Sequence, residues 1–319
     1  MATASWAALG HASAEDVATF LRDAAPVALI EQIRAASDDE IVAATHDHRR
    51  GSSVVEGVMH RIGELAVPAL LALMAGRVRW EAVDRPGEAV TLCFRDGVVE
   101  VEADPAGTPD VVVRGSDVQL LRLVAGQLDV AVAYLGDRIE ISGASSVALA
   151  VASLFAADGT PPVTGEPVDV RAIDPVEVAR ALHGVPADHL RSVMASDFRP
   201  VILEEILERM PAFVNGRKAA GVQITVGFRL TGRPDGEVDR FVLRLRDGEA
   251  SVLAGPAAQA VDRQDRHATV TCEAADFLRL VTGHLSAVSG VLRGQLRVHG
   301  DKVAALRLNA AFDIPTAVA

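Results

Sequence analysis

Residues 278–312 read LRLVTGHLSAVSGVLRGQLRVHGDKVAALRLNAAF, and residues 121–155 read LRLVAGQLDVAVAYLGDRIEISGASSVALAVASLF. The two stretches align without a gap at an offset of 157 positions, which places Gly126 on Gly283. Because the match runs through apolar positions and turn glycines alike, the sequence indicates a tandem duplication.

Each stretch predicts a helix, a second short apolar segment, a strand and a closing helix. In the second copy the first helix follows Phe277 and ends at Gly283. Residues 295–299 alternate polar and apolar side chains, which is typical of a strand with one buried face. Asp301 stands where its side-chain oxygen can cap the closing helix, so we expect a capping role for this carboxylate.

A hairpin is predicted upstream of each stretch. Asp-Gly pairs at 96–97 and 247–248 each separate two β-like runs, and Asp-Gly readily supplies the positive φ angles of a tight turn. Short apolar runs at 111–113 and 268–271 add a further strand just before each LRLV helix. Helical patterns precede these strands, so each copy is expected to mix helices with a sheet.

In the second copy, GVQITVGFRLTGRPDG (221–236) precedes FLRLVTG (277–283), LRGQLRVHGD (292–301) and FDIP (312–315). This ordered set resembles the sterol carrier protein 2 family in its actinobacterial form. The first copy resembles that family less, because Ala144 replaces the aspartate of the Gly-Asp pair and RLTGRPDG has no clear counterpart. The resemblance implies an α+β fold with two tandem sterol-carrier-like domains, each a mainly antiparallel five-stranded sheet covered by helices.

The two copies predict the domain organisation. We expect a divergent N-terminal sterol-carrier-like domain over residues 1–157, a Pro/Gly-rich linker over 158–170 and a C-terminal domain over 171–319. At 319 residues the chain is long enough for each domain to bury a core of its own.

Composition narrows the class of partner. The chain has 31 basic and 43 acidic residues, and a net charge of −12 repels nucleic acid phosphates and anionic lipid surfaces. Its longest apolar run, 147–157, is far shorter than the ~20 residues that span a bilayer. The N-terminus lacks the basic and apolar regions of a secretory signal. We therefore expect a cytoplasmic protein with no nucleic acid partner and no stable membrane insertion, and a monomer whose two halves pack together.

Signatures of phosphate-binding loops, serine hydrolases and zinc proteases are absent from the sequence. His46, Asp47 and His48 could contribute to a metal site, but HDH beside two arginines is more typical of a polar loop between helices. We predict no metal, no cofactor and no catalytic residue. Cys93 and Cys272 lie in separate β-like runs without a CxxC partner, so buried, reduced thiols are expected.

The resemblance also implies an apolar tunnel for sterols, fatty acids or their coenzyme A esters. An apolar stripe at helical spacing is in itself ordinary core, so only the resemblance points to a tunnel. Carried over by position, the lining in the second copy comprises Phe277, Leu278, Leu280, Val281, Leu285, Val288, Val291, Leu292, Leu296 and Val298. The weaker lining in the first copy comprises Leu120, Leu121, Leu123, Val124, Leu128, Val132, Tyr134 and Leu135.

Three functions stay open. The sequence favours a non-catalytic lipid carrier that binds sterols or fatty acyl groups, and we expect the second copy to hold most of the ligand. The alternative is a cavity recruited as an enzyme that cyclises or isomerises an apolar metabolite in secondary metabolism. His284, His299, Asp301 and Tyr134 are its polar candidates. A third possibility is a structural protein with solid interiors.

Overall fold

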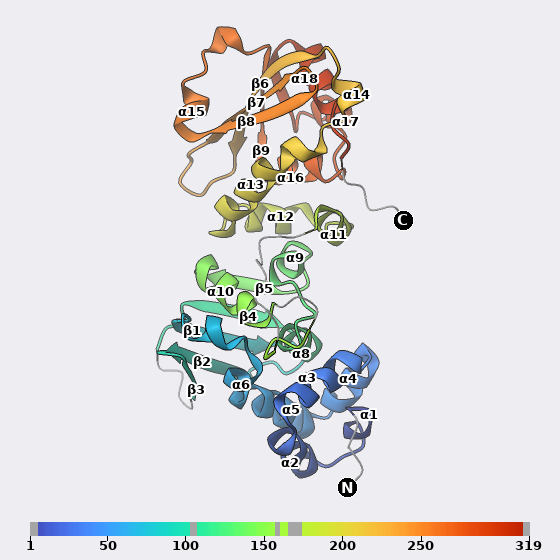
Figure 1. The fold of residues 1–319 in the computed structure, drawn as a ribbon, viewed down its shortest axis with the longest axis vertical. Coiled ribbons are helices and arrows are strands. Elements are labelled where there is room, and N and C mark those ends of the chain that lie inside the picture. The colour runs from blue at the N-terminus through green and yellow to red at the C-terminus, as the bar shows by residue number, and fades with distance from the viewer. Residues whose placement is uncertain (1–5, 103–106, 157–159, 165–173, 315–319) are drawn as a thin grey trace. The chain divides into compact units, whose positions relative to one another are not determined.

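The computed structural model describes residues 6–102, 107–156, 160–164 and 174–314. The chain divides into two compact units, Met1–Ala172 and Ile173–Ala319. Figure 1 shows the elements of both units. Of the predicted linker, residues 158–170, only 160–164 lie among the described residues.

The first unit contains a five-stranded sheet in the order β3-β2-β1-β4-β5. β1 pairs antiparallel with β2 and parallel with β4, while β3 and β5 form the antiparallel edges. The turn between β2 and β3 contains Asp96 (φ 52°) and Gly97 (φ 77°), so the predicted hairpin is present. The strands are β1 (Gly76–Ala82), β2 (Ala89–Arg95), β3 (Val98–Glu102), β4 (Val111–Gly115) and β5 (Glu140–Gly143).

The second unit contains a sheet with the same arrangement, ordered β10-β9-β6-β7-β8. Here β6 pairs antiparallel with β7 and parallel with β9. The strands are β6 (Gln223–Thr231), β7 (Asp239–Arg246), β8 (Glu249–Ala254), β9 (Ala268–Glu273) and β10 (Arg297–Gly300). The predicted α+β fold, with two mainly antiparallel five-stranded sheets covered by helices, is confirmed.

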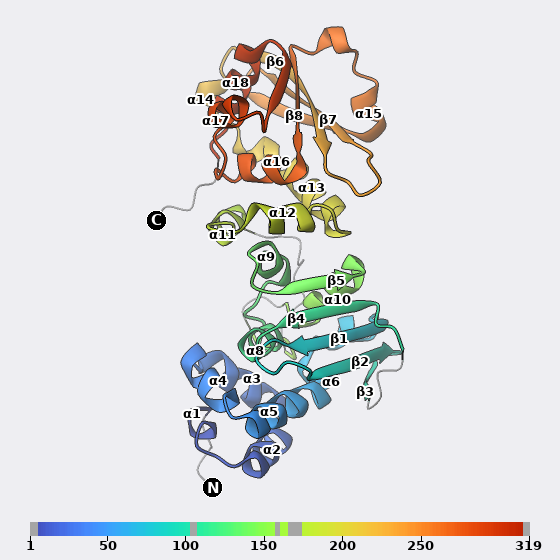
Figure 2. The ribbon, with the colours of Figure 1, turned by 180° about the vertical axis from the view of Figure 1, so that it is seen from behind.

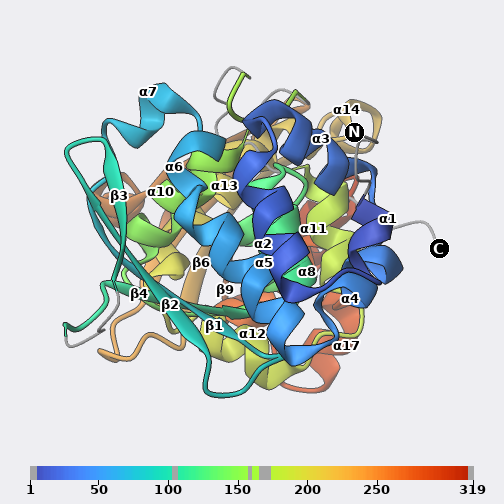
Figure 3. The same cartoon turned by 90° about the horizontal axis from the view of Figure 1, so that it is seen from below.

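Helices cover one face of the first sheet, as Figure 2 shows from behind. α5, α6 and α10 pack on its strands, and α2 lies along α5 on the outer side (Figure 3). Serine caps with reciprocal hydrogen bonds start α4 at Ser37 and α8 at Ser116. The helices are α1 (Trp6–Leu9), α2 (Ala14–Asp23), α3 (Pro26–Ala35), α4 (Asp38–Thr45), α5 (His48–His60), α6 (Ile62–Leu65), α7 (Pro68–Leu71), α8 (Asp117–Val124), α9 (Val130–Leu135) and α10 (Ser145–Phe155).

In the second unit α16 and α18 pack on β6 and β9. The predicted cap is confirmed, because the Asp301 carboxylate accepts from the backbone N–H groups of Val303 (2.8 Å) and Ala304 (3.1 Å). The helices are α11 (Pro175–Ala181), α12 (Ala187–Val193), α13 (Phe198–Arg209), η1 (Met210–Phe213), α14 (Gly216–Ala219), α15 (Gly255–Gln259), η2 (Arg263–Asp265), α16 (Ala274–Val281), α17 (Ala287–Leu292) and α18 (Lys302–Ala310).

A second small core lies on the opposite face of the second sheet. Val242 points away from its neighbours Phe241 and Leu243 on β7, because successive strand residues face opposite sides. It packs with Ala258 and Val261, which come from α15 and the loop after it. None of the helices within the described residues is long and apolar enough to cross a membrane.

Candidate functional site

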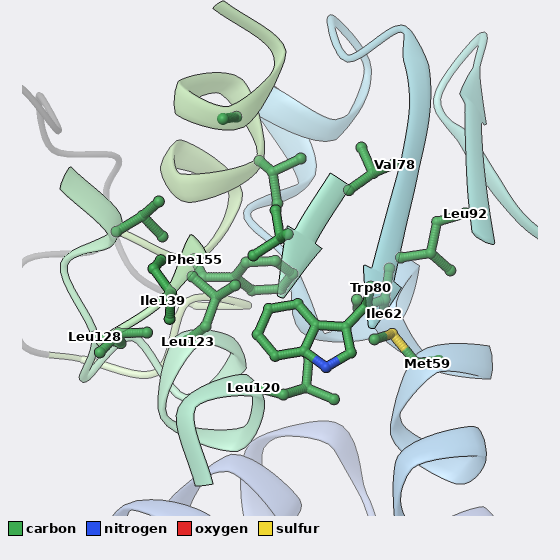
Figure 4. A pocket seen from close by; sticks show the side chains of 14 residues that line it. Met59, Ile62, Val78, Trp80, Leu92, Leu120, Leu123, Leu128, Ile139 and Phe155 are labelled. Carbon is green, nitrogen blue, oxygen red and sulfur yellow. The ribbon is translucent and has the colours of Figure 1, made fainter. Parts of the chain in front are cut away.

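A small cavity lies between the first sheet and its helices (Figure 4). All of its lining side chains are apolar apart from the indole N–H of Trp80. They come from β1, β2 and β4 on the sheet side, from α5, α6, α8, α9 and α10 on the helix side, and from the segments after α8 and α9. The lining comprises Met59, Ile62, Val78, Trp80, Leu92, Val113, Leu120, Leu123, Leu128, Val130, Ile139, Ala148, Val151 and Phe155.

Strand register places the sheet side of this lining on one face. Val78 and Trp80 are two residues apart on β1, so both side chains face the helices. The register sets Val78 beside Leu92 on β2 and Trp80 beside Val113 on β4. Adjacent strands therefore contribute an unbroken apolar floor to the cavity.

The cavity volume is about 20 Å³, which is room for about one water molecule. Sites for small organic ligands generally enclose several hundred Å³. The cavity is thus a narrow space between the sheet and the helices. To admit a lipid, the helices would have to move away from the sheet.

Helix α8 forms one wall of the cavity, and a buried ion pair anchors its first residue. Asp117 is fully buried, and Arg85 donates to both of its carboxylate oxygens, with 2.8 Å from Nη2 to Oδ1. The Asp117 backbone N–H donates to Asp84 (2.8 Å). Burial raises the pKa of Asp117 above its ordinary value, and the hydrogen bond from Arg85 opposes that shift. Gly51 makes room for this pair, since a Cβ there would lie 2.7 Å from Arg85 Nη1 and 2.4 Å from the Thr45 oxygen.

The α8 wall is also tied down along its length. Arg122 donates to the carbonyl oxygens of Ile33 (2.9 Å) and Ala36 (2.6 Å) and to the carboxylate of Asp38 (2.7 Å). α10, by contrast, begins at Ala144, whose side chain cannot cap a helix. The two helical walls therefore differ: side chains hold α8, whereas backbone hydrogen bonds hold α10, from Ala144 N–H to the Asp110 carbonyl (2.9 Å) and from Val67 N–H to the Leu154 carbonyl (2.8 Å).

Trp80 is the one lining residue with a hydrogen-bond donor in its side chain. Its indole Nε1 is buried and has no acceptor among the described residues. A buried donor without an acceptor costs about 1–3 kcal/mol, so such groups are rare and call for an explanation.

The predicted first-copy residues are divided by the structure. Leu120, Leu123 and Leu128 line the cavity. The others are buried but are not part of its lining: Leu121, Val124, Val132, Tyr134 and Leu135. Sequence reasoning missed the sheet side, the contributions of α5, α6 and α10, and the residues Val130 and Ile139. The alternating pattern of Val78 and Trp80 in RVRWEA is the signal that could have revealed the sheet side.

The predicted second-copy residues do not share one environment. Phe277, Leu278, Leu280, Leu285 and Leu296 are buried, and Val281, Val291 and Val298 are half-buried. Val288 and Leu292, however, lie exposed on α17. Their placement gives no support to the expectation that these two line a tunnel, because each side chain faces outward from its short helix.

Three phenylalanines fill the interior of the second unit beside α16. Phe228 of β6 stacks on Phe241 of β7 with ring centroids 4.6 Å apart. Phe277 of α16 meets both rings, at 5.8 Å and 5.3 Å. These centroid distances lie within the usual range for aromatic pairs, so the three rings pack against one another.

The polar candidates of the second unit have other roles. The ring of His284 lies 2.7 Å from the carbonyl oxygen of Ala179, through Nε2. His299 is exposed on β10, and Asp301 caps α18. Within the described residues there is no group of three His, Cys, Asp or Glu side chains that could hold a metal ion.

Two protein-family models match the chain. Residues 60–156 match the SCP-2 sterol transfer family, and residues 193–317 match the alkyl sulfatase C-terminal family. All the cavity-lining residues except Met59 fall within the first match. No curated protein matches the chain.

Several solved structures are similar to parts of the chain. The inverting sec-alkylsulfatase Pisa1 from Pseudomonas sp. has 18% identity, covers 43% of this chain with a TM-score of 0.31, and is matched over only 20% of its own length. Sterol carrier protein 2 from Yarrowia lipolytica has 18% identity and a TM-score of 0.28, with 38% of this chain and 98% of that chain covered. Sterol carrier protein-2 like-3 from Aedes aegypti has 23% identity and a TM-score of 0.28, with 35% and 93% covered.

The sequence placed the family resemblance mainly in the second copy, whereas the sterol-transfer model matches the first. The matched region comprises the first sheet and the helices α6 to α10. The predicted resemblance to the sterol carrier protein 2 family is therefore confirmed, and residues 60–156 are the part of the chain that matches the sterol-transfer family.

Proposed function

We propose that the chain is a lipid carrier and that its first unit binds an apolar ligand of the sterol, fatty acid or acyl-CoA class. One observation carries this proposal: an apolar cavity lies between sheet and helices inside the region that matches the sterol-transfer family. Sequence favoured the second copy as the ligand site. The proposal moves the ligand to the first unit because the cavity lies there, while the rings of Phe228, Phe241 and Phe277 pack against one another at the corresponding place in the second.

Ligand entry requires the cavity to widen, and α10 is the wall that moves. α8 is held at its start by Arg85 and near its end by Arg122. α10 has no side-chain cap at Ala144 and supplies Ala148, Val151 and Phe155 to the lining. Displacing this helix opens the apolar seam without breaking the buried ion pair.

The ligand carries an oxygen that accepts a hydrogen bond from Trp80. This pairing satisfies the indole Nε1, which has no acceptor among the described residues. A sterol hydroxyl, a carboxylate or an ester carbonyl provides such an acceptor, whereas a plain hydrocarbon does not. Trp80→Phe keeps an aromatic ring and removes the donor, so it should weaken an oxygen-bearing ligand about 2- to 10-fold and leave a hydrocarbon unaffected.

Trp80 also provides the test of the function. The chain has two tryptophans, so Trp6→Phe leaves Trp80 as the sole emitter at the cavity. cis-Parinaric acid, which accepts energy from tryptophan, should quench this emission to saturation, and oleate should restore it. Quenching that rises linearly without saturation, together with no lipid bound to protein purified from its own host, would contradict the carrier function.

A second candidate function is an enzyme acting on an apolar metabolite. The observation that favours it is the match of residues 193–317 to the alkyl sulfatase C-terminal family. Incubation with a secondary alkyl sulfate and with candidate terpenoid substrates distinguishes the two functions. Release of sulfate or a rearranged product, lost on His284→Ala or His299→Ala, would favour the enzyme, while saturable binding without turnover favours the carrier.

The carrier is proposed to act in the cytoplasm as a monomer, with domain boundaries at residues 157 and 171 as the duplication predicts. Light scattering in dilute solution should give the mass of one chain, 33.5 kDa. Limited proteolysis should cut first between residues 158 and 170, and a first cut inside either sheet would move the boundaries.

A further inference from the structure

Two short helices of the second unit expose a cluster of large apolar side chains. The exposed fractions are 54% for Val288 and 82% for Leu292 on α17, and 59% for Val303 and 40% for Leu306 on α18. Residues four apart on α17 and three apart on α18 lie on one side of their helix, and the two helices contact each other. Apolar side chains gathered in this way mark an interaction site more often than scattered ones.

Basic side chains accompany this cluster. Arg293, Arg297, Lys302 and Arg307 are all exposed, and none of them has an ion-pair partner among the described residues. We call these eight residues the α17–α18 face: Val288, Leu292, Arg293, Arg297, Lys302, Val303, Leu306 and Arg307. Figures 1 and 2 both place α14 beside these helices, where Arg217 adds another exposed cation.

Few acidic groups oppose these charges. Asp301 uses its carboxylate to cap α18, and Asp313 is paired with Lys218 at 2.8 Å. The face is thus strongly positive in a chain whose net charge is −12. Such a charge asymmetry orients a protein toward an anionic surface and turns its acidic remainder away.

We propose that the α17–α18 face docks on the surface of an anionic lipid bilayer. Exposed valine and leucine side chains can enter the headgroup boundary while arginine and lysine contact anionic headgroups, each cation contributing about 1 kcal/mol. A single-stranded nucleic acid is the poorer partner, because the face has no aromatic side chain for base stacking. A second copy is also poorer, since a twofold interface would set like charges against each other.

This docking is peripheral and independent of the cavity in the first unit. Surface docking suits a lipid carrier, because it holds the protein where lipids are taken up and released. The expectation of no stable membrane insertion is compatible with surface docking, and the described helices are all too short to span a bilayer.

Vesicle sedimentation of the full chain provides the test. The protein should bind vesicles of equal parts phosphatidylcholine and phosphatidylglycerol, bind phosphatidylcholine alone far more weakly, and detach in high salt. Arg293→Glu with Arg297→Glu should lower partition at least about tenfold, and Leu292→Ser severalfold. Leu123→Trp, which fills the cavity of the first unit, should leave vesicle binding unchanged, and this separates the two proposals.

Two control variants are matched to these changes. Arg246→Glu with Arg263→Glu alters the net charge equally at exposed sites outside the face. Leu73→Ser removes an equally exposed leucine, 81% exposed, from the first unit. Both controls should bind like the unaltered chain. No binding to the mixed vesicles, equal losses in the controls, or a dimer that dissociates on Leu292→Ser would each overturn membrane docking.

Discussion

The first and second units share one strand order but fill the space under their helices differently. Strand register places Trp80 beside Val113 and Phe228 beside Val270, so these two aromatic residues occupy corresponding positions. In the first unit Trp80 lies beside a cavity. In the second, Phe228 meets two more phenylalanine rings. The same strand order therefore carries an apolar cavity in one unit and a cluster of three aromatic rings in the other.

At the surface, it is the second unit that exposes large apolar side chains on its last helix. Leu149 on α10 is 8% exposed and Leu306 on α18 is 40% exposed, although the two occupy aligned positions. In the first unit α7 packs against α10, while the outer side of α18 is left uncovered. This contrast underlies the two proposals, ligand binding by the first unit and membrane docking by the second.

The largest expected effect comes from the buried ion pair. Asp117→Ala removes the fully buried partner of Arg85, which keeps only the half-buried Glu88 (2.7 Å), so we expect a loss of about 3–5 kcal/mol in the first unit. The matched change in the second unit, Asp239→Ala, should cost about 1–2 kcal/mol, because Arg199 keeps hydrogen bonds to Met194 (2.8 Å) and Thr231 (3.0 Å) carbonyls. Scanning calorimetry measures both losses of stability. Equal losses would show that the Arg85–Asp117 and Arg199–Asp239 pairs stabilise their units equally.

A smaller difference is expected at the aligned leucines on α10 and α18. Leu149→Ala removes a buried side chain and should cost about 2–4 kcal/mol, whereas Leu306→Ala should cost less than about 1 kcal/mol. Urea unfolding followed in each variant gives the two values. A similar loss at both sites would mean that the α17–α18 face is covered in solution.

The thiol reactivity of the two cysteines compares the two units in the unaltered chain. Burial raises the pKa of Cys272 to about 12, while Cys93 is only partly buried. Because the raised pKa disfavours the thiolate, Cys272 is almost wholly protonated at pH 8, and its reactivity should keep rising with pH up to about 12. Iodoacetamide at pH 8, followed by peptide mass mapping, should label Cys93 first. Preferential labelling of Cys272 would show that the second unit opens readily.

Local pattern was enough to predict much of the fold. Asp96-Gly97 and Asp247-Gly248 marked their hairpins, and Asp301 marked the start of α18, because turns and caps depend on neighbouring residues. Leu135 and Leu292 show the limit. They align perfectly at the offset of 157, yet one is 4% exposed and the other 82%. Burial depends on which distant element covers a helix, and that information lies outside the aligned segment.

The candidate site was predictable only in part for the same reason. Leu120 and Leu123 could be found because helical spacing places them on one side of α8. Met59, Trp80 and Leu92 come from distant parts of the chain, and they meet the α8 leucines only when the sheet forms. Whether such residues enclose a space or fill it depends on side-chain volumes at several positions at once.

The central claim is that the first unit, and not the second, holds the apolar ligand. Its most direct test is calorimetric titration of a fatty acid into two full-length variants, Leu123→Trp and Leu280→Trp, whose sites align at the same offset. Leu123→Trp adds bulk where the cavity must widen for a ligand, so it should reduce affinity at least about tenfold while costing about 1–3 kcal/mol of stability. Leu280→Trp should destabilise the second unit by about 1–3 kcal/mol and leave affinity unchanged. Loss of binding in Leu280→Trp with normal binding in Leu123→Trp would contradict the account.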